Sequence, residues 1–394
     1  MNKHAFLRGG LTAALLLLTA CAGTPADSGG PGLRGTGALG IVIGRASGQV
    51  MVVDNDHRRA LAMVDGLGDL SHASAVYSHD ERYAYVAGRD GGLTKVDLLR
   101  GRIVKRILQA GNSIGLSISE DGRIIAVQNY KPGGVRFFDA DTLAPLSSLV
   151  THSRVVGLAD APGQRFVFSL FDTGEIWLAD LTDPRHPKVT RFTDVGREPY
   201  DGLITPDGHY YIAGLFGEDG LDLLDMWHPE RGVRRILDHY GEGHPPLPVY
   251  KMPHLRGWAQ AGRQILVPAV GHHEVLVIDT DTWTEKARIP VAGQPVFVIA
   301  RPDHRQVWVN FAFPDNGTLQ VIDLESDTVI DTLHPGRAIL HMEFTPRGDQ
   351  VWVSARDDNK VLIFDTASRK VVGQLPMPSP SGIFFSDRAH KIGL

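Results

Sequence analysis

The sequence predicts an all-β protein built as a single eight-bladed β-propeller. Three observations support this: apolar strands alternate with period two, each copy of the pattern ends in an aspartate, and the copies are spaced by about the length of one four-stranded blade. The steps between successive aspartates are 43, 42, 41, 45, 54, 44 and 42 residues. The eight aspartates are Asp54, Asp97, Asp139, Asp180, Asp225, Asp279, Asp323 and Asp365. A strand repeat of this length suits a propeller blade, which packs only against its neighbours.

The first residues are expected to be a lipoprotein signal peptide. Residues 1–20 combine a short basic start, an apolar run at 11–18 and small residues before Cys21. The stretch Leu-Thr-Ala-Cys resembles a lipobox, in which cleavage leaves Cys21 as a lipidated N-terminus. Residues 21–37 are rich in Gly, Pro and Ser and are interpreted as a flexible tether. The propeller is expected to occupy residues 38–394, on the periplasmic side of a membrane that holds the anchor.

Composition excludes several classes of function. The net charge of −5 contains no long run of either sign, so we expect no nucleic-acid partner. Cys21 is the only cysteine, so the mature chain has no disulfide within itself, no other thiol nucleophile and no thiolate metal cluster.

The order of the strands predicts how the ring closes. Turns such as those at 78–82, 119–123 and 205–209 join the first strand of a blade to the second. The last turn of this kind, at 386–390, has no blade after it, whereas the segment 38–48 aligns with 83–92 and lacks a preceding strand. The C-terminal strand is therefore expected to complete blade one, which removes open sheet edges. The long 54-residue step contains an insert near 239–255, interpreted as a loop over one face.

The loops that enter each innermost strand identify candidate binding residues. Counting back a fixed number of residues from each turn gives one position per blade at the mouth of the central channel. These positions form a ring that includes cations, two histidines and a tyrosine, with no comparable set of carboxylates. Its members are His72, Ser113, Arg154, Pro199, Tyr200, Pro253, His254, Pro295 and the neighbourhood of Arg337, with Arg197 close by and Arg89 aligned with Arg45. Arginine pairs bidentately with carboxylates and imidazole can ligate iron, so the ring suits a flat tetrapyrrole. Ordinary solvated loops are the alternative explanation, and His72 alone would more simply be a surface histidine.

Several segments resemble the heme d1 propeller of cytochrome cd nitrite reductases. They are LSHASAVYSHDERYAYVAGRDGGLTKVDL at 70–98, SRVVGLADAPGQRFVFSLFDTGEIWLADL at 153–181, YDGL at 200–203 and AGQPVFVIARPDHRQVWVN at 292–310. In that family the blade matching 70–98 supplies the axial histidine to heme d1. The chain departs from the reductases because one cysteine cannot form a CxxCH heme attachment motif. Non-histidine residues near Ala269 and Arg301 stand where the reductases place two distal histidines, so nitrite reduction is not expected.

A single-domain d1-type propeller with a lipobox resembles the NirF family, which acts late in heme d1 biosynthesis. The resemblance implies heme d1 or dihydro-heme d1 as ligand or substrate, His72 as the iron ligand, and Asp160 as a functionally essential acid. It also implies nitrite reductase and other heme d1 maturation proteins as partners. From the residues alone, Asp160 could relay a proton at the macrocycle or could cap the turn that follows it.

Three classes of function stay open at this point. An oxidoreductase-like enzyme would change a side chain of the precursor, for instance by dehydrogenating a propionate. A non-catalytic carrier would deliver heme d1 to nitrite reductase and would need no acid or base. A lipid-anchored propeller scaffold would bind no small ligand. A propeller face without a partner domain could also pair with a second copy, which gives a homodimer as an expectation.

Two other motifs are assigned no chemistry. The tandem His272-His273 projects to opposite sides of a strand and is interpreted as a solvated turn rather than a metal site. The glycine-rich GRDGG at 88–92 lies between two strands and does not open a helix, so a dinucleotide site is excluded.

Overall fold

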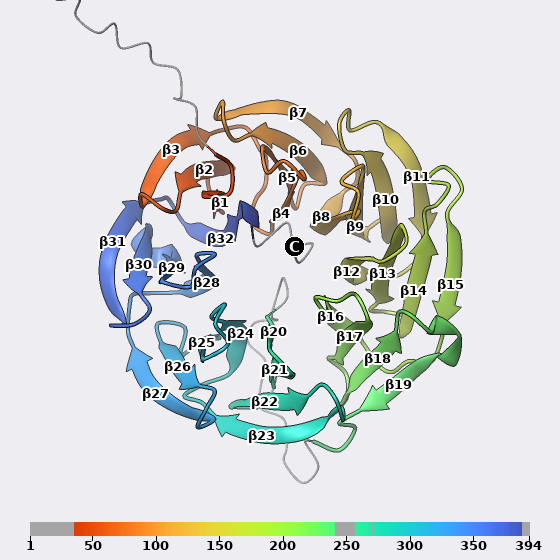
Figure 1. Cartoon of the computed structure of the whole chain (residues 1–394). Coiled ribbons are helices and arrows are strands. Elements are labelled where there is room, and N and C mark those ends of the chain that lie inside the picture. Colours follow the sequence, from red (N-terminus) through yellow and green to blue (C-terminus); the bar gives the residue numbers. More distant parts are fainter. Residues whose placement is uncertain (1–34, 241–256, 270–271, 388–394) are drawn as a thin grey trace, which may run out of the picture. The chain divides into compact units, whose positions relative to one another are not determined.

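The alternating segments form 32 strands in eight four-stranded antiparallel sheets in the computed structural model, which describes residues 35–240, 257–269 and 272–387. The sheets stand as blades around a central axis (Figure 1). The eight-bladed propeller predicted from the sequence is therefore confirmed. Each repeat cannot bury both sides of its sheet alone, and stacking against two neighbours completes its core. The signal peptide, Cys21 and nearly all of the insert, with His254, lie outside the described residues.

Blades one to four come from the closing C-terminal strand and the first half of the chain. Blade 1 consists of β32 (Pro380–Phe385), β1 (Leu39–Gly44), β2 (Gln49–Asp54) and β3 (Arg59–Val64). Blade 2 consists of β4 (Ser74–Tyr77), β5 (Tyr83–Ala87), β6 (Gly92–Asp97) and β7 (Arg102–Leu108). Blade 3 consists of β8 (Asn112–Ile118), β9 (Ile124–Lys131), β10 (Gly134–Asp139) and β11 (Pro145–Val150). Blade 4 consists of β12 (Val155–Ala161), β13 (Arg165–Leu170), β14 (Glu175–Asp180) and β15 (Lys188–Phe192).

Blades five to eight follow in the same order, innermost strand first. Blade 5 consists of β16 (Pro199–Ile204), β17 (Tyr210–Leu215), β18 (Leu221–Asp225) and β19 (Val233–Ile236), with the short helix η1 (Pro229–Arg231). Blade 6 consists of β20 (Ala259–Ala261), β21 (Gln264–Pro268), β22 (Glu274–Asp279) and β23 (Thr284–Pro290). Blade 7 consists of β24 (Pro295–Ala300), β25 (Gln306–Phe311), β26 (Leu319–Asp323) and β27 (Thr328–Leu333). Blade 8 consists of β28 (Ile339–Phe344), β29 (Gln350–Ala355), β30 (Lys360–Asp365) and β31 (Lys370–Pro376), with η2 (Arg356–Asp358).

The eight recurring aspartates cap turns, as the repetition predicts. Each ends the third strand of its blade and accepts a hydrogen bond from a backbone N–H two or three residues further on, for example Asp180 from Thr182 and Asp323 from Ser326. These hydrogen bonds hold the pKa of Asp180 and Asp323 below the ordinary value. The turns between first and second strands lie on the same side, which we call the aspartate face.

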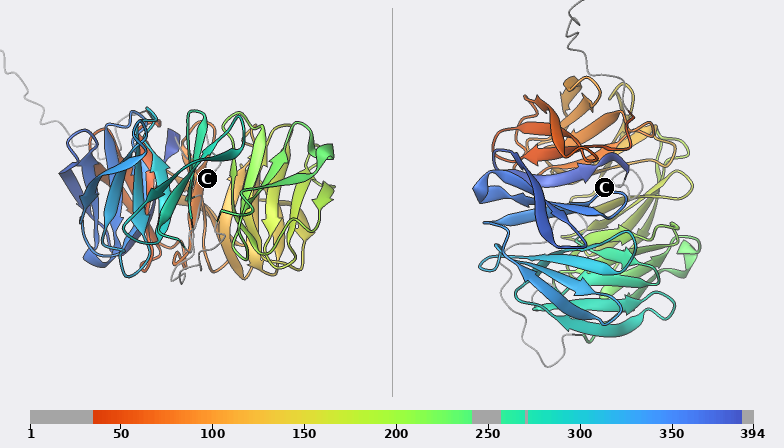
Figure 2. Two further views of the ribbon diagram at one scale, coloured as in Figure 1. Left: turned by 90° about the horizontal axis from the view of Figure 1, so that it is seen from below. Right: turned by 60° about the vertical axis from the view of Figure 1, so that its left-hand side comes forward.

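The opposite side, which we call the connection face, carries two sets of loops (Figure 2). One set joins the outer strand of each blade to the innermost strand of the next, and the other joins second to third strands. Both sets lie on one side because antiparallel strands reverse direction at every turn. Residues of a binding site on this face therefore come from loops that are fixed at both ends by strands of the blades.

Blade 1 is closed by the two ends of the described chain. β32 pairs with β1, with Gly40 opposite Phe385 and Val42 opposite Ile383. The neighbouring blade adds a buried contact, since the Tyr77 hydroxyl donates to the Phe384 carbonyl oxygen at 2.6 Å. The predicted closure is confirmed. No helix in the described ranges is long and apolar enough to cross a membrane.

Candidate functional site

One position of the second strand recurs on the connection face of the described blades. In each blade the capping aspartate pairs with a residue of the second strand, and the recurring position lies six residues after that residue. In blade 1, for example, Asp54 pairs with Leu39, and the recurring position is Arg45. Blades 8, 1 and 2 carry arginine there, blades 3 to 5 carry an aromatic residue, and blade 7 carries alanine. These residues are Arg356, Arg45, Arg89, Tyr130, Phe171, Phe216 and Ala312. These equivalent positions therefore place cations along one arc of the connection face and aromatic rings along another.

The three arginines form a cationic arc over blades 8, 1 and 2. Within the described part of the chain, neither Arg45 nor Arg89 makes a side-chain hydrogen bond or ion pair, although the Asp69 carboxylate lies near enough to attract both. Arg356 pairs with the adjacent Asp357 at 2.6 Å. Burial, followed by the charges of Arg356 and Arg89, lowers the pKa of Arg45, and the nearby carboxylate of Asp69 offsets part of this effect. An anionic ligand would relieve the repulsion between these arginine charges.

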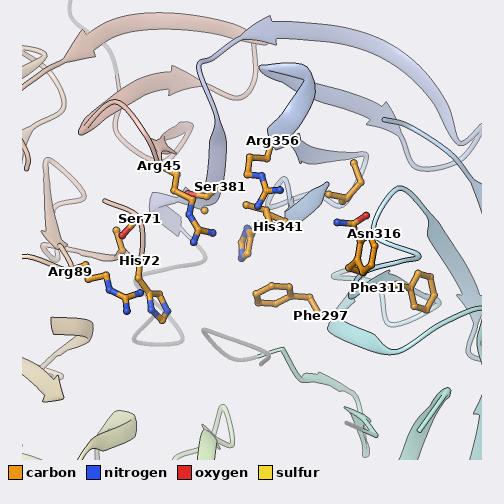
Figure 3. A pocket seen from close by; sticks show the side chains of 15 residues that line it. Arg45, Ser71, His72, Arg89, Phe297, Phe311, Asn316, His341, Arg356 and Ser381 are labelled. Atoms are coloured by element: carbon orange, nitrogen blue, oxygen red, sulfur yellow. The ribbon is translucent and has the colours of Figure 1, made fainter. Parts of the chain in front are cut away.

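A pocket of about 420 Å³ opens between this arc and blade 7. Its polar side carries Arg45, His72, Arg89, Arg356 and His341, which Figure 3 shows around one space. Its apolar side carries the rings of Phe297, Phe311 and Phe313 together with Ile339 and Leu340. The pocket therefore suits a flat apolar body that bears carboxylates on one side.

His72 is positioned by a braced loop between β3 and β4. The Asp69 carboxylate accepts the Ser71 N–H at 2.8 Å, and the Asp69 N–H donates to Asp90 at 3.3 Å. The Arg89 N–H donates to the Asp69 carbonyl oxygen at 2.8 Å, which ties this loop to the turn that carries Arg89. In Figure 3 the His72 ring lies beside the Arg89 guanidinium group. The structure thus brings together two of the residues predicted from the sequence.

His341 is a second histidine in the same pocket. The pairing of β28 with β29 shifts register between Ile339 and Met342, and a bulge of this kind re-aims side chains of the innermost strand. The His341 Nδ1 accepts the Ile383 N–H at 3.2 Å, so the neutral ring carries its proton on Nε2. The buried ring packs edge-on against Phe297, with centroids 5.1 Å apart. It is a candidate for proton transfer inside the pocket.

Tyr200 lies outside this pocket, in an aromatic cluster of blades 3 to 5. Its ring contacts Phe171 and Phe216 at centroid distances of 5.7 Å and 6.1 Å. Its hydroxyl lies 3.4 Å from that of Tyr130. Burial raises the pKa of both tyrosines, so both hydroxyls stay protonated. Figure 1 shows that blades 3 to 5 stand across the central axis from blades 7, 8 and 1.

The other predicted cations of the ring are each paired with an acid. Arg154 contacts Asp172 at 2.5 Å, Arg197 contacts Glu218 at 3.2 Å, and Arg337 contacts Asp358 at 2.8 Å. Arg154 also lies 4.0 Å from the ring centre of Phe171. None of the three lines the pocket that holds His72. The expectation that the ring has no matching carboxylates is corrected here, because the partner acids come from the turns between second and third strands.

Glu218 also takes part in a half-buried ion network that ends at the buried Asp222. It accepts from Arg235 at 3.0 Å, and Arg235 donates to Asp222 at 3.0 Å. The side chain of Asp222 is only 1% exposed, and its Oδ2 has no hydrogen-bond partner among the described residues. Burial raises the pKa of Asp222 from 3.8 to about 6, against the attraction of Arg235.

This raised pKa predicts a pH dependence of stability. Between pH 4 and pH 6 the unfolded chain releases the Asp222 proton while the folded chain retains it, so stability falls as pH rises, by about 3 kcal/mol in all. In Asp222→Asn that loss of stability should disappear. The melting temperature of the variant, relative to that of wild type, should therefore rise between pH 4 and pH 8. Thermal unfolding at several pH values measures this. Asp194→Asn, an exposed neighbour, should follow wild type, and parallel curves for Asp222→Asn would contradict the prediction.

Asp160 lies on β12, the innermost strand of blade 4, and does not line the pocket. Its N–H donates to the Ser117 hydroxyl oxygen at 3.0 Å, and that hydroxyl approaches the Asp160 carboxylate at 3.4 Å. Asp160 thereby joins the inner strands of blades 3 and 4. His254 and Cys21 cannot be placed, since they lie outside the described residues.

Counting along the sequence missed three features of the pocket. Arg356 stands where Arg45 and Arg89 stand, and extending their alignment to VSARDDNK would have found it. His341 lies at a strand bulge that recurs in the innermost strands of several blades, and counting back from the turns stopped short of these positions. Phe297 and Phe313 line the pocket as well, and neither was among the residues that the counting identified.

The model of the cytochrome D1 heme domain family matches residues 34–389. "Protein NirF" of Stutzerimonas stutzeri is 58% identical over 98% of the chain and 98% of its own length. "Protein NirF" of Pseudomonas aeruginosa is 60% identical over 96% of the chain and 98% of its own length. The solved structure of dihydro-heme d1 dehydrogenase NirN in complex with DHE superposes with a TM-score of 0.78 at 24% identity, over 93% of this chain and 78% of that one.

Proposed function

The chain belongs to the NirF family of cytochrome D1 heme domain proteins, and on that premise we propose that it acts in heme d1 biosynthesis by binding a late tetrapyrrole precursor. The ligand is dihydro-heme d1 or a close precursor, held in the pocket between the cationic arc and blade 7. His72 ligates its iron, and Arg45, Arg89 and Arg356 meet its carboxylates. This step serves the maturation of respiratory nitrite reductase.

One observation carries the proposal. A histidine, three arginines and an aromatic wall meet around a single pocket, and these are the groups needed for the iron, the carboxylates and the apolar face of such a ligand. A surface loop that is polar only because it is solvated would not gather two arginines without ion pairs, among the described residues, opposite a wall of three aromatic rings. The same observation weighs against a scaffold without a small ligand.

We further propose that the protein changes a side chain of the bound macrocycle. A dehydrogenation of propionate to acrylate removes two electrons and two protons, so the reaction needs an electron acceptor and a group that takes a proton. His341 lies in the pocket and could take it, whereas Asp160 is the acid that the family resemblance favours. Because Asp160 lies outside the pocket, a carrier that hands the unchanged ligand to nitrite reductase is the competing proposal.

An absorption titration of the purified domain with iron-loaded dihydro-heme d1 tests binding. A shifted spectrum that saturates at one ligand per chain supports the proposal, and an unshifted spectrum contradicts it. Incubation with an artificial electron acceptor, followed by extraction and mass determination, then asks whether the macrocycle loses two hydrogens.

The comparison of Asp160→Asn with His341→Gln separates catalyst from carrier. For a catalyst, at least one variant should bind the ligand with nearly wild-type affinity yet fail to restore nitrite reductase activity in cells that lack the native protein. For a carrier, every variant that binds should also restore activity. Ser117→Ala is the matched control for Asp160, since it removes the hydrogen bond but keeps the carboxylate.

The cellular setting is part of the proposal. A lipid on Cys21 would anchor the protein to a membrane facing the periplasm, where nitrite reductase and other maturation proteins are its partners. A homodimer through a propeller face is proposed as its assembly. Palmitate labelling of wild type against Cys21→Ser and light scattering of the soluble domain test the two statements.

A further inference from the structure

We infer that the pocket selects tetrapyrroles by the arrangement of their carboxylates: it takes a macrocycle with carboxylates gathered along one part of its edge and another edge free of them. The inference rests on the proposed function and deepens it by naming a feature of the ligand. It follows from the unequal distribution of charge and aromatic side chains around the connection face.

Among the arginines of the described connection-face loops, those that can accept a ligand carboxylate lie along one arc, over blades 8, 1 and 2. Arg45 and Arg89 make no ion pair within the described residues, and Arg356 shares the exposed Asp357 beside it. The other ring arginines are held by Asp172, Glu218 and Asp358. A carboxylate placed over blades 4 and 5 would meet cations that are already neutralised, and it would have to compete with a carboxylate of the protein.

Blade 7 forms the opposite wall of the pocket and contributes aromatic rings. Phe297 belongs to β24, Phe311 ends β25, and Phe313 lies in the turn that follows. The only polar side chain that blade 7 adds to the described lining is the neutral amide of Asn316. A carboxylate against this wall would lose water without gaining a cation, which is costly, whereas a methyl-bearing edge would gain contact.

Phe313 is the part of this wall that a substitution can change without disturbing the core. Its side chain is 63% exposed, whereas Phe297 and Phe311 are 4% and 1% exposed. A bound macrocycle would cover part of the exposed Phe313 ring. Phe313 is therefore proposed as a residue that determines ligand specificity, distinct from those that bind iron or carboxylate.

The two iron(III) coproporphyrins I and III test the inference because they share mass and four carboxylates. In isomer I every edge between adjacent rings bears one methyl and one propionate. In isomer III the reversed ring gives one edge with two propionates and one edge with two methyls. We expect wild type to bind isomer III about tenfold more tightly than isomer I, as measured by absorption titration.

The variant Phe313→Lys places a cation on the aromatic wall. It should tighten binding of isomer I and reduce the ratio between the isomers to about two or less, because an ion pair replaces an uncompensated carboxylate. Leu108→Lys is the matched control: Leu108 is 68% exposed at the end of β7 and lies outside the pocket, so the ratio should stay at the wild-type value.

The outcomes separate this inference from the function on which it rests. Equal binding of both isomers by wild type overturns the selectivity while tetrapyrrole binding stands. Binding of neither isomer, nor of dihydro-heme d1, overturns the proposed function and the inference with it. The comparison of isomers on wild type does not depend on how any variant folds.

Discussion

Replacing His72 by alanine is expected to weaken the binding of iron-loaded dihydro-heme d1 by at least about 100-fold, since even groups that only orient a metal ligand contribute 10- to 100-fold to affinity. The absorption bands that report an imidazole on the iron should disappear as well. The loop that carries His72 is held by Asp69 and Asp90 through backbone contacts, so the variant should keep the fold and melting temperature of wild type.

Rescue of His72→Ala by added imidazole tests iron ligation more directly. In His72→Ala it should enter the vacated position and restore the wild-type spectrum, which a general weakening of the pocket would not allow. His186→Ala is the control, because its side chain is 82% exposed on the aspartate face. Unchanged bands in His72→Ala would show that another residue ligates the iron.

Reversing the charge of the cationic arc is expected to have the largest effect on affinity. Arg45→Glu combined with Arg89→Glu should weaken binding about 1,000-fold, because two attractive charge-assisted contacts become repulsive in a partly buried pocket. At saturating ligand the spectrum should equal that of wild type, since His72 is still present. The methyl ester of the same macrocycle should lose far less affinity, because it carries no carboxylate charge.

The matched control is Arg305→Glu combined with Arg347→Glu. Both residues are exposed in turns between first and second strands, on the aspartate face, and the change in net charge is the same. This pair should bind the ligand with wild-type affinity. An equal loss in both double variants would attribute the effect to overall charge and contradict a specific arc.

The sequence predicted the fold in detail because each blade repeats the same local rules. Alternating strands and the aspartate that caps the following turn act within a few residues, and closure follows from an unmatched strand at each end. The aspartates at Asp180 and Asp323 behave as expected. A pattern repeated eight times also averages out the ambiguity of any single strand.

The candidate site was only partly predictable, for identifiable physical reasons. His72 and Arg89 follow from register and resemblance, and both line the pocket. Arg154 and Arg197 were expected to meet the ligand as free cations, but their partners Asp172 and Glu218 lie about twenty residues further along the chain, in turns whose approach to the ring depends on blade geometry. His341 lies at a bulge in β28. Similar register shifts occur in the innermost-strand pairings of blades 1, 3, 4, 5 and 7, so the repeat sets the bulge, but the counting from the turns did not include these positions.

The pairing of β32 with β1 also sets the order in which the molecule can mature. Ribosomes deliver β1 first and β32 last, so the inner edge of β1 waits without a partner until nearly the whole chain is available. An unpaired strand edge of this kind is a template for aggregation. Loss of the last fifteen residues would remove one strand, β32, from only one blade, yet it would leave the ring open. A functional pocket therefore requires that the C-terminus be synthesised intact.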